Sequence, residues 1–177
     1  MAADYLISSL QPLSFDGPAP YTAAQYLDLC RAQLDARTVE ALTAILQDQP
    51  LASPTGPAAA WTDLVTQLRN AIAVARARAK GLDPAKWRHA AEGCSLYWAN
   101  RVKAAFQEKN PAQRDRQLDQ VWWDAAGELT PPASPLSTAA AFTYAIRLAC
   151  VLRRQALSAE TGNRVFDDLT AATKLDL

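Results

Sequence analysis

The chain has 177 residues, of which 50% are hydrophobic and 20% charged, and its 18 basic side chains balance 18 acidic ones. This length suffices for a single domain with a sizeable core. The balance of charge excludes a general attraction to nucleic acid or to anionic membranes, so an electrostatic partner would have to be recognised by a local patch. The longest apolar stretch, 139–152, is interrupted by Thr143 and Arg147 and is shorter than the ~20 residues of a membrane span. With no signal peptide visible, we expect a soluble, intracellular protein.

The N-terminal part of the chain begins with a short apolar segment, 2–10, whose spacing fits a helix but whose length does not exclude a strand. An irregular connector is predicted over 11–21, because its glycine and three prolines disfavour regular structure. Thr22 and Gln25 then form a capping-box pattern, which predicts that a helix begins directly after Thr22.

Two further helices are predicted before the middle of the chain. The first covers 38–47 and is followed by a loop over 49–58 that contains three prolines. The second is a long amphipathic helix over 61–80, with apolar residues every three or four positions and Gly81 as its C-cap.

The dipeptides Asp83-Pro84 and Asn110-Pro111 have the chemistry of helix starts, with a capping side chain followed by proline. We expect the first to open a helix that continues to Phe106, with a break near Gly93. The second should open a helix that ends at Gly127.

The most apolar helix of the chain is predicted over 138–156. Its hydrophobic side chains cover nearly the whole circumference, which is typical of a central, buried helix. A final helix is predicted over 161–173. Because no segment alternates with a period of two, the sequence predicts an all-α bundle of six to eight helices, forming one domain over 1–177.

The residues needed for common catalytic sites are scarce. The chain has one histidine, His89, and its six glycines are scattered without a phosphate-binding loop, so we expect neither ATP hydrolysis nor a cofactor. Cys30, Cys94 and Cys150 are widely spaced. They are expected to be small buried hydrophobic residues in a reducing compartment. The alternative is a zinc site, for which the three cysteines and His89 would supply the four ligands.

Carboxylates at a spacing of four residues could form acid–base pairs on one helix face. The two pairs are Asp115 with Asp119 and Asp124 with Glu128. A di-iron site would also need two Glu-x-x-His motifs, and the sequence has none. We therefore expect these carboxylates to lie on a solvated helix face.

Arg69, Arg76 and Lys80 share one flank of the long helix, by the ~100° advance per residue. Two interpretations remain open. The favoured one is a solvated border whose aliphatic stems cover the apolar stripe, and the other is a docking edge for an acidic partner.

Tryptophans and one arginine supply the other interface candidates. Trp61, Trp87 and Trp98 are expected in the core. Trp122 and Trp123 point in directions ~100° apart, so one of the two is a candidate interface anchor.

Arg147 is a charge within the most apolar helix. We expect it either to pair with a carboxylate or to be exposed at a partner surface, because unpaired burial of a charge costs several kcal/mol.

Short motifs distributed over most of the chain resemble those of a bacterial family of domains of unknown function, family 2764. The motifs, in order, are Tyr5-Leu6-Ile7-Ser8-Ser9-Leu10 with Pro12-Leu13-Ser14-Phe15 and Gly17-Pro18, then Leu68-Arg69-Asn70, Leu118-Asp119 with Trp122, Ser134-Pro135-Leu136-Ser137 leading into 141–148, and Glu160-Thr161-Gly162 with Val165-Phe166. Members of that family resemble the C subunit of V/A-type ATPases, and their genes tend to lie beside those of the enzyme's other components.

The resemblance implies a helical, non-catalytic adaptor in an ion-transporting V-type rotary ATPase. The C subunit links the central stalk to the membrane ring, so the implied location is cytoplasmic and peripheral to the membrane. The chain is much shorter than an ordinary C subunit and is expected to lack a helical repeat. The alternative is a free-standing helical interaction or assembly protein, as a monomer or a homodimer.

Overall fold

The structure is a computed structural model that describes residues 2–91 and 93–157, together with residues 162, 164, 165, 167 and 170. In this part of the chain the fold is all-helical, with seven α-helices and no strand. This confirms the predicted all-α bundle. The helix expected over 161–173 falls mostly outside the described residues.

Three short helices form the N-terminal part of the fold: α1 (Ala2–Ser9), α2 (Ala23–Arg31) and α3 (Ala36–Leu46). The capping box at the start of α2 is present, with Thr22 and Gln25 each accepting a hydrogen bond from the other's backbone N–H. Helix α3 begins two residues earlier than predicted. The reason is Asp35, whose carboxylate accepts from the backbone N–H of Thr38 at 2.9 Å and thereby caps the helix.

The middle of the chain differs most from the prediction, and it comprises α4 (Pro57–Ala79), the 3₁₀ turn η1 (Pro84–Trp87) and α5 (Leu96–Ala105). Helix α4 begins four residues before 61, because Pro57 fits the first helical position. The helix expected from Asp83 to Phe106 is present only in its second part, as α5, after the break expected near Gly93. In the first part, Asp83 caps the short 3₁₀ turn η1 instead of an α-helix. The described residues between η1 and Ser95 have no helical structure, and Ser95 caps α5.

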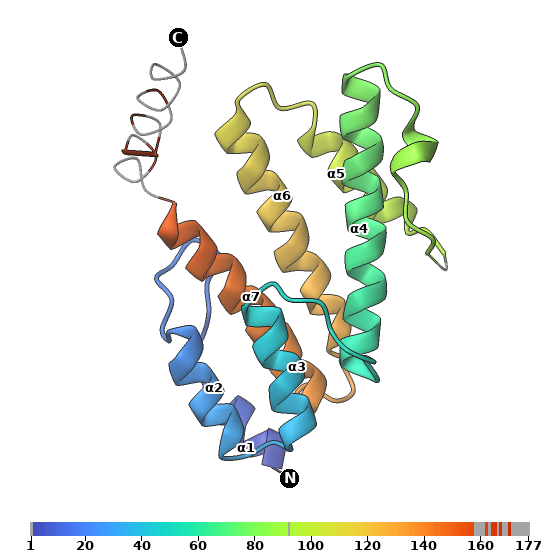
Figure 1. Ribbon diagram of the computed structural model, residues 1–177. Helices are drawn as coiled ribbons and strands as arrows, with labels where there is room; N and C mark the ends of the chain where they lie inside the picture. The colour runs from blue at the N-terminus through green and yellow to red at the C-terminus, as the bar shows by residue number, and fades with distance from the viewer. Residues whose placement is uncertain are drawn as a thin grey trace.

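The last part contains α6 (Pro111–Ala126), the 3₁₀ turn η2 (Gly127–Leu129) and α7 (Thr138–Ala156). Helix α7 lies between the group α1–α3 and the group α4–α6 (Figure 1). Nine of its 19 residues are buried, which confirms the predicted central helix. It contacts α1, α2, α3, α4 and α6 directly, whereas α5 packs on α4 and α6.

One hydrophobic core connects all seven helices. It contains, for example, Leu6 of α1, Tyr26 of α2, Leu68 of α4, Val102 of α5 and Leu148 of α7. None of the helices in the described part combines the length and the apolar character that a membrane crossing requires.

Candidate interaction surface

Most arginines of the described helices serve to fasten one segment to another. Arg116 of α6 and Arg154 of α7 both donate to the Asp16 carboxylate, at 2.8 Å and 3.1 Å. The guanidinium of Arg154 also lies 4.1 Å from the centre of the Phe15 ring and donates to the Phe15 carbonyl. Residues of the N-terminal connector are therefore clamped between α6 and α7.

The carboxylates of α6 that were expected on a solvated face include two with structural partners. Asp119 is only 2% exposed and pairs with Arg153 of α7. Asp124 accepts from Arg101 of α5 at 2.8 Å and from Gln120 at 2.8 Å. The prediction of a solvated face is thus wrong for these two residues, because arginines of neighbouring helices form ion pairs with them.

Arg147 is half-buried and has a partner that the sequence did not indicate. Its Nε donates to the backbone carbonyl of Trp123 at 3.2 Å, and its guanidinium lies 5.0 Å from the centre of that ring. Burial lowers the pKa of Arg147, and the nearby Asp124 carboxylate opposes that shift. A peptide carbonyl and an aromatic face thus replace the expected direct carboxylate partner. The Arg147 side chain also lies close to Gly127. A Cβ atom added at Gly127 would be 3.0 Å from Nη2 of Arg147.

Neither tryptophan of the Trp122-Trp123 pair is an exposed anchor. Trp122 is partly buried and packs edge-on against Trp61 of α4, with ring centroids 5.8 Å apart. Trp123 is 9% exposed and packs against Phe15, at 5.5 Å. The two side chains do diverge, as predicted, and each meets a different part of the same protein.

The three cations on the flank of α4 are exposed, and we call Arg69, Arg76 and Lys80 the basic edge. Arg69 lies 3.6 Å from Asp48, but the two side chains are 62% and 94% exposed, so solvent weakens this pair. Arg76 and Lys80 form no ion pair with any residue that the structure describes.

A neighbouring face of α4 holds the segment that follows η1. The side chain of Asn70 donates to the carbonyl of His89 at 2.9 Å and accepts from the N–H of the same residue at 2.8 Å. Gln67 accepts from the backbone N–H of Ser95 at 3.0 Å. These side-chain amides hold a segment without regular secondary structure, whose described residues from 88 to 94 are all exposed.

Sequence reasoning missed the exposure of η1 and its surroundings. Trp87, expected in the core, is 57% exposed, and Leu82 is 48% exposed. A usable signal was the local charge. Residues 76–88 contain five basic side chains against one acidic side chain, that of Asp83.

Potential catalytic and metal-binding groups lie apart. Cys30 is buried, Cys94 is exposed and Cys150 is intermediate, so the expectation of three buried thiols is wrong for Cys94. The described residues include no group of three or more histidine, cysteine or carboxylate side chains placed to hold a metal ion.

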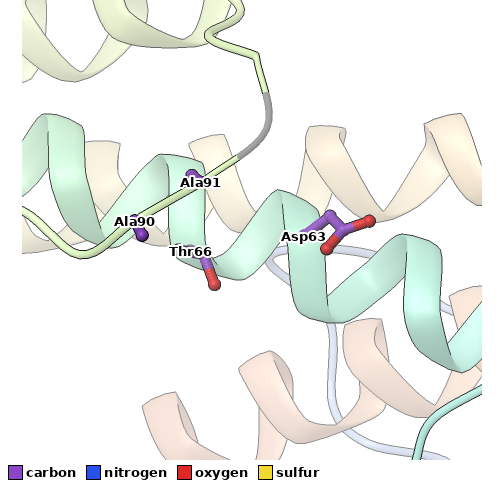
Figure 2. Close-up of a pocket in the computed structure, with 4 residues that line it drawn as sticks. All are labelled: Asp63, Thr66, Ala90 and Ala91. Atoms are coloured by element: carbon purple, nitrogen blue, oxygen red, sulfur yellow. The ribbon is translucent and has the colours of Figure 1, made fainter.

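A pocket of about 330 Å³ separates α4 from the segment after η1, as Figure 2 shows. It is lined by Asp63, Thr66, Ala90 and Ala91. A larger one of about 520 Å³ lies between α3, the loop before α4 and the start of α7. Among the described residues that line these two pockets there is no histidine, cysteine or lysine.

Comparisons of the chain with protein-family models, with curated proteins and with solved structures found no match.

Proposed function

We propose that the chain is a non-catalytic, α-helical docking subunit. The observation that carries this proposal is the basic edge, where Arg76 and Lys80 face solvent without an ion pair in the described part of the chain. Arginines that hold helices together, such as Arg101 and Arg116, have carboxylate partners within the protein. Cations left unpaired on a rigid helix are available to the carboxylates of another protein.

The complex to which this protein belongs is, in our proposal, a V-type rotary ATPase. The ordered motifs that resemble the family related to the ATPase C subunit support this assignment, and the all-helical fold is compatible with it. Central-stalk proteins of such enzymes are coiled coils, whose exposed positions carry charged residues. The basic edge would bind a row of their carboxylates, while the chain links the stalk to the membrane ring.

Co-expression with the central-stalk protein of the V-type ATPase from the same organism, followed by size-exclusion chromatography at low and moderate salt, tests this proposal. We expect co-elution at low salt that weakens as salt is added, because exposed charges are screened. The double substitution Arg69→Glu with Arg76→Glu should abolish co-elution. The matched control is Lys103→Glu with Lys109→Glu, which changes the net charge equally at exposed positions outside the edge and should leave co-elution intact.

If two folded proteins elute separately at every salt concentration, the docking role in this ATPase is wrong. A dimer or a different partner would then favour the free-standing interaction protein.

A further inference from the structure

A second group of exposed side chains lies on the end of α4 and on η1, the turn that contacts this helix. We call it the Trp87 platform, and it consists of Arg76, Lys80, Leu82, Lys86, Trp87 and Arg88. All six are exposed, and the four cations form no ion pair with the residues that the structure describes. The turn η1, which carries Lys86 and Trp87, contacts α4 and lies beside it on the outer side of the fold (Figure 1).

Trp87 differs from the other tryptophans of the chain. Trp61, Trp98 and Trp123 are at most 9% exposed, and Trp122 packs against the core. Trp87 belongs to a 3₁₀ turn in which no residue is buried, so its ring is not part of the hydrophobic core. A large exposed aromatic side chain among unpaired cations has the composition of an interface anchor.

The backbone that carries Trp87 is held in place from both sides. Before it, Pro84 occupies the first position of the turn, and the Asp83 carboxylate accepts from the N–H of Ala85 at 3.0 Å. After it, Asn70 binds the N–H and carbonyl of His89. A side chain presented on a fixed backbone loses less conformational entropy on binding than one on a loose loop.

We propose that the Trp87 platform binds an acidic helical surface of a partner protein, with Trp87 as the central anchor. This inference rests on the proposed docking function and specifies where the contact is centred. Charge complementarity carries it, because the platform offers four cations that have no ion pair among the described residues, and arginine forks pair well with carboxylates.

Two other classes of partner fit the platform less well. A membrane surface would need a wider apolar face than Leu82 and Trp87 provide. A single strand of nucleic acid would need several aromatic rings for successive bases, and this platform has one.

Calorimetric titration of the full chain with the central-stalk protein tests the platform. We expect Trp87→Ala to weaken binding by ~30-fold, as truncation of an interface anchor does. Lys86→Glu with Arg88→Glu should weaken it and reduce its salt dependence. The control Tyr5→Ala removes a ring that is 68% exposed on α1 and should change the affinity less than ~2-fold. All variants should melt like the parent chain, since these side chains are exposed.

The outcomes separate the two proposals. A wild-type complex that is indifferent to Trp87→Ala and to the charge reversal overturns the platform and leaves the docking function standing. No wild-type complex at all overturns the docking function and the platform with it. If Trp87→Ala weakens binding to phosphatidylserine vesicles or to an oligonucleotide but does not affect the stalk complex, the platform binds a membrane or a nucleic acid and not an acidic protein.

Discussion

Tyr26 illustrates how a single side chain connects distant parts of this fold. It is fully buried on α2, and its hydroxyl donates to the backbone carbonyl of Ala141 on α7 at 2.8 Å. Its ring stacks on that of Tyr144, with centroids 5.2 Å apart. Burial raises the pKa of Tyr26, so the hydroxyl keeps its proton and remains a hydrogen-bond donor over the pH range in which the protein is folded.

Replacing Tyr26 by Phe should lower the free energy of unfolding by about 1 kcal/mol, because one buried hydrogen bond is lost while the ring remains. Urea denaturation of the two proteins would measure the difference. Tyr5→Phe, at an exposed position of α1, should leave the midpoint unchanged. Equal midpoints for Tyr26→Phe and the parent would show that the Ala141 contact contributes no stability.

The burial of a residue could be predicted only where it follows from the spacing of apolar residues within its own helix. Leu68 and Leu148 are buried as their helical spacing indicates. Trp123 could not be placed from its spacing, because its cover comes from Phe15 in the connector. Asp119 and Arg147 likewise have partners far away in the sequence, on other elements.

Among the elements, helix starts were predicted correctly where the capping side chain was recognised in the sequence. Thr22 and Asn110 begin α2 and α6 as their capping chemistry indicates, because a cap involves only the next few residues. Whether a segment becomes helical depends also on distant side chains. The described residues between η1 and Ser95 are not helical, and Asn70 of α4 binds the backbone of His89 there.

Asn70→Ala should release this segment. The backbone N–H and carbonyl of His89 would lose their partner, at a cost of about 1–3 kcal/mol where they stay shielded from water. Better helix propensity of alanine offsets up to ~0.7 kcal/mol of that loss.

Hydrogen exchange by NMR would detect the release as faster exchange of the His89 and Ser95 amides. The matched control, Asn100→Ala, changes an exposed asparagine of α5 and should leave both amides protected. Unaltered exchange in Asn70→Ala would mean that other contacts hold the segment. Since the same segment presents Trp87, the substitution should also weaken partner binding.

At the scale of the whole molecule, the N-terminal connector joins two helices that come late in the chain. Asp16 is the polar centre of this junction, where hydrogen bonds from Arg116 and Arg154 lower the pKa of its carboxyl group. A carboxyl group with a lowered pKa in the folded state stabilises the fold above its unfolded pKa. That contribution is lost as the pH falls through the lower, folded value.

We therefore expect Asp16→Asn to destabilise the protein at neutral pH and to matter progressively less below about pH 4, where the parent carboxyl also becomes protonated. Thermal melts of both proteins between pH 7 and pH 3 would measure the gap in melting temperature. Asp63→Asn, at an exposed site on α4, is the control and should show little gap at any pH. A gap for Asp16→Asn that stays constant down to pH 3 would contradict the argument.

The architecture as a whole was predictable in class and only partly in arrangement. The all-round apolar pattern of 138–156 identified the central helix, because only burial on every side accommodates it. The division of the other helices into two groups on either side of α7 could not be predicted from the sequence. An amphipathic pattern shows which face of a helix is buried, but not which other helix covers that face.

The central position of α7 also affects how the protein is made. Helices α1, α2 and α3 emerge from the ribosome first, yet the helix on which they pack is synthesised roughly 100 residues later. At ~5–20 residues per second, that delay lasts on the order of 5–20 s. During this delay, side chains such as Tyr26 and Leu42 lack the helix against which they are buried in the folded protein. We therefore expect chaperones to bind the nascent N-terminal half until α7 has been synthesised.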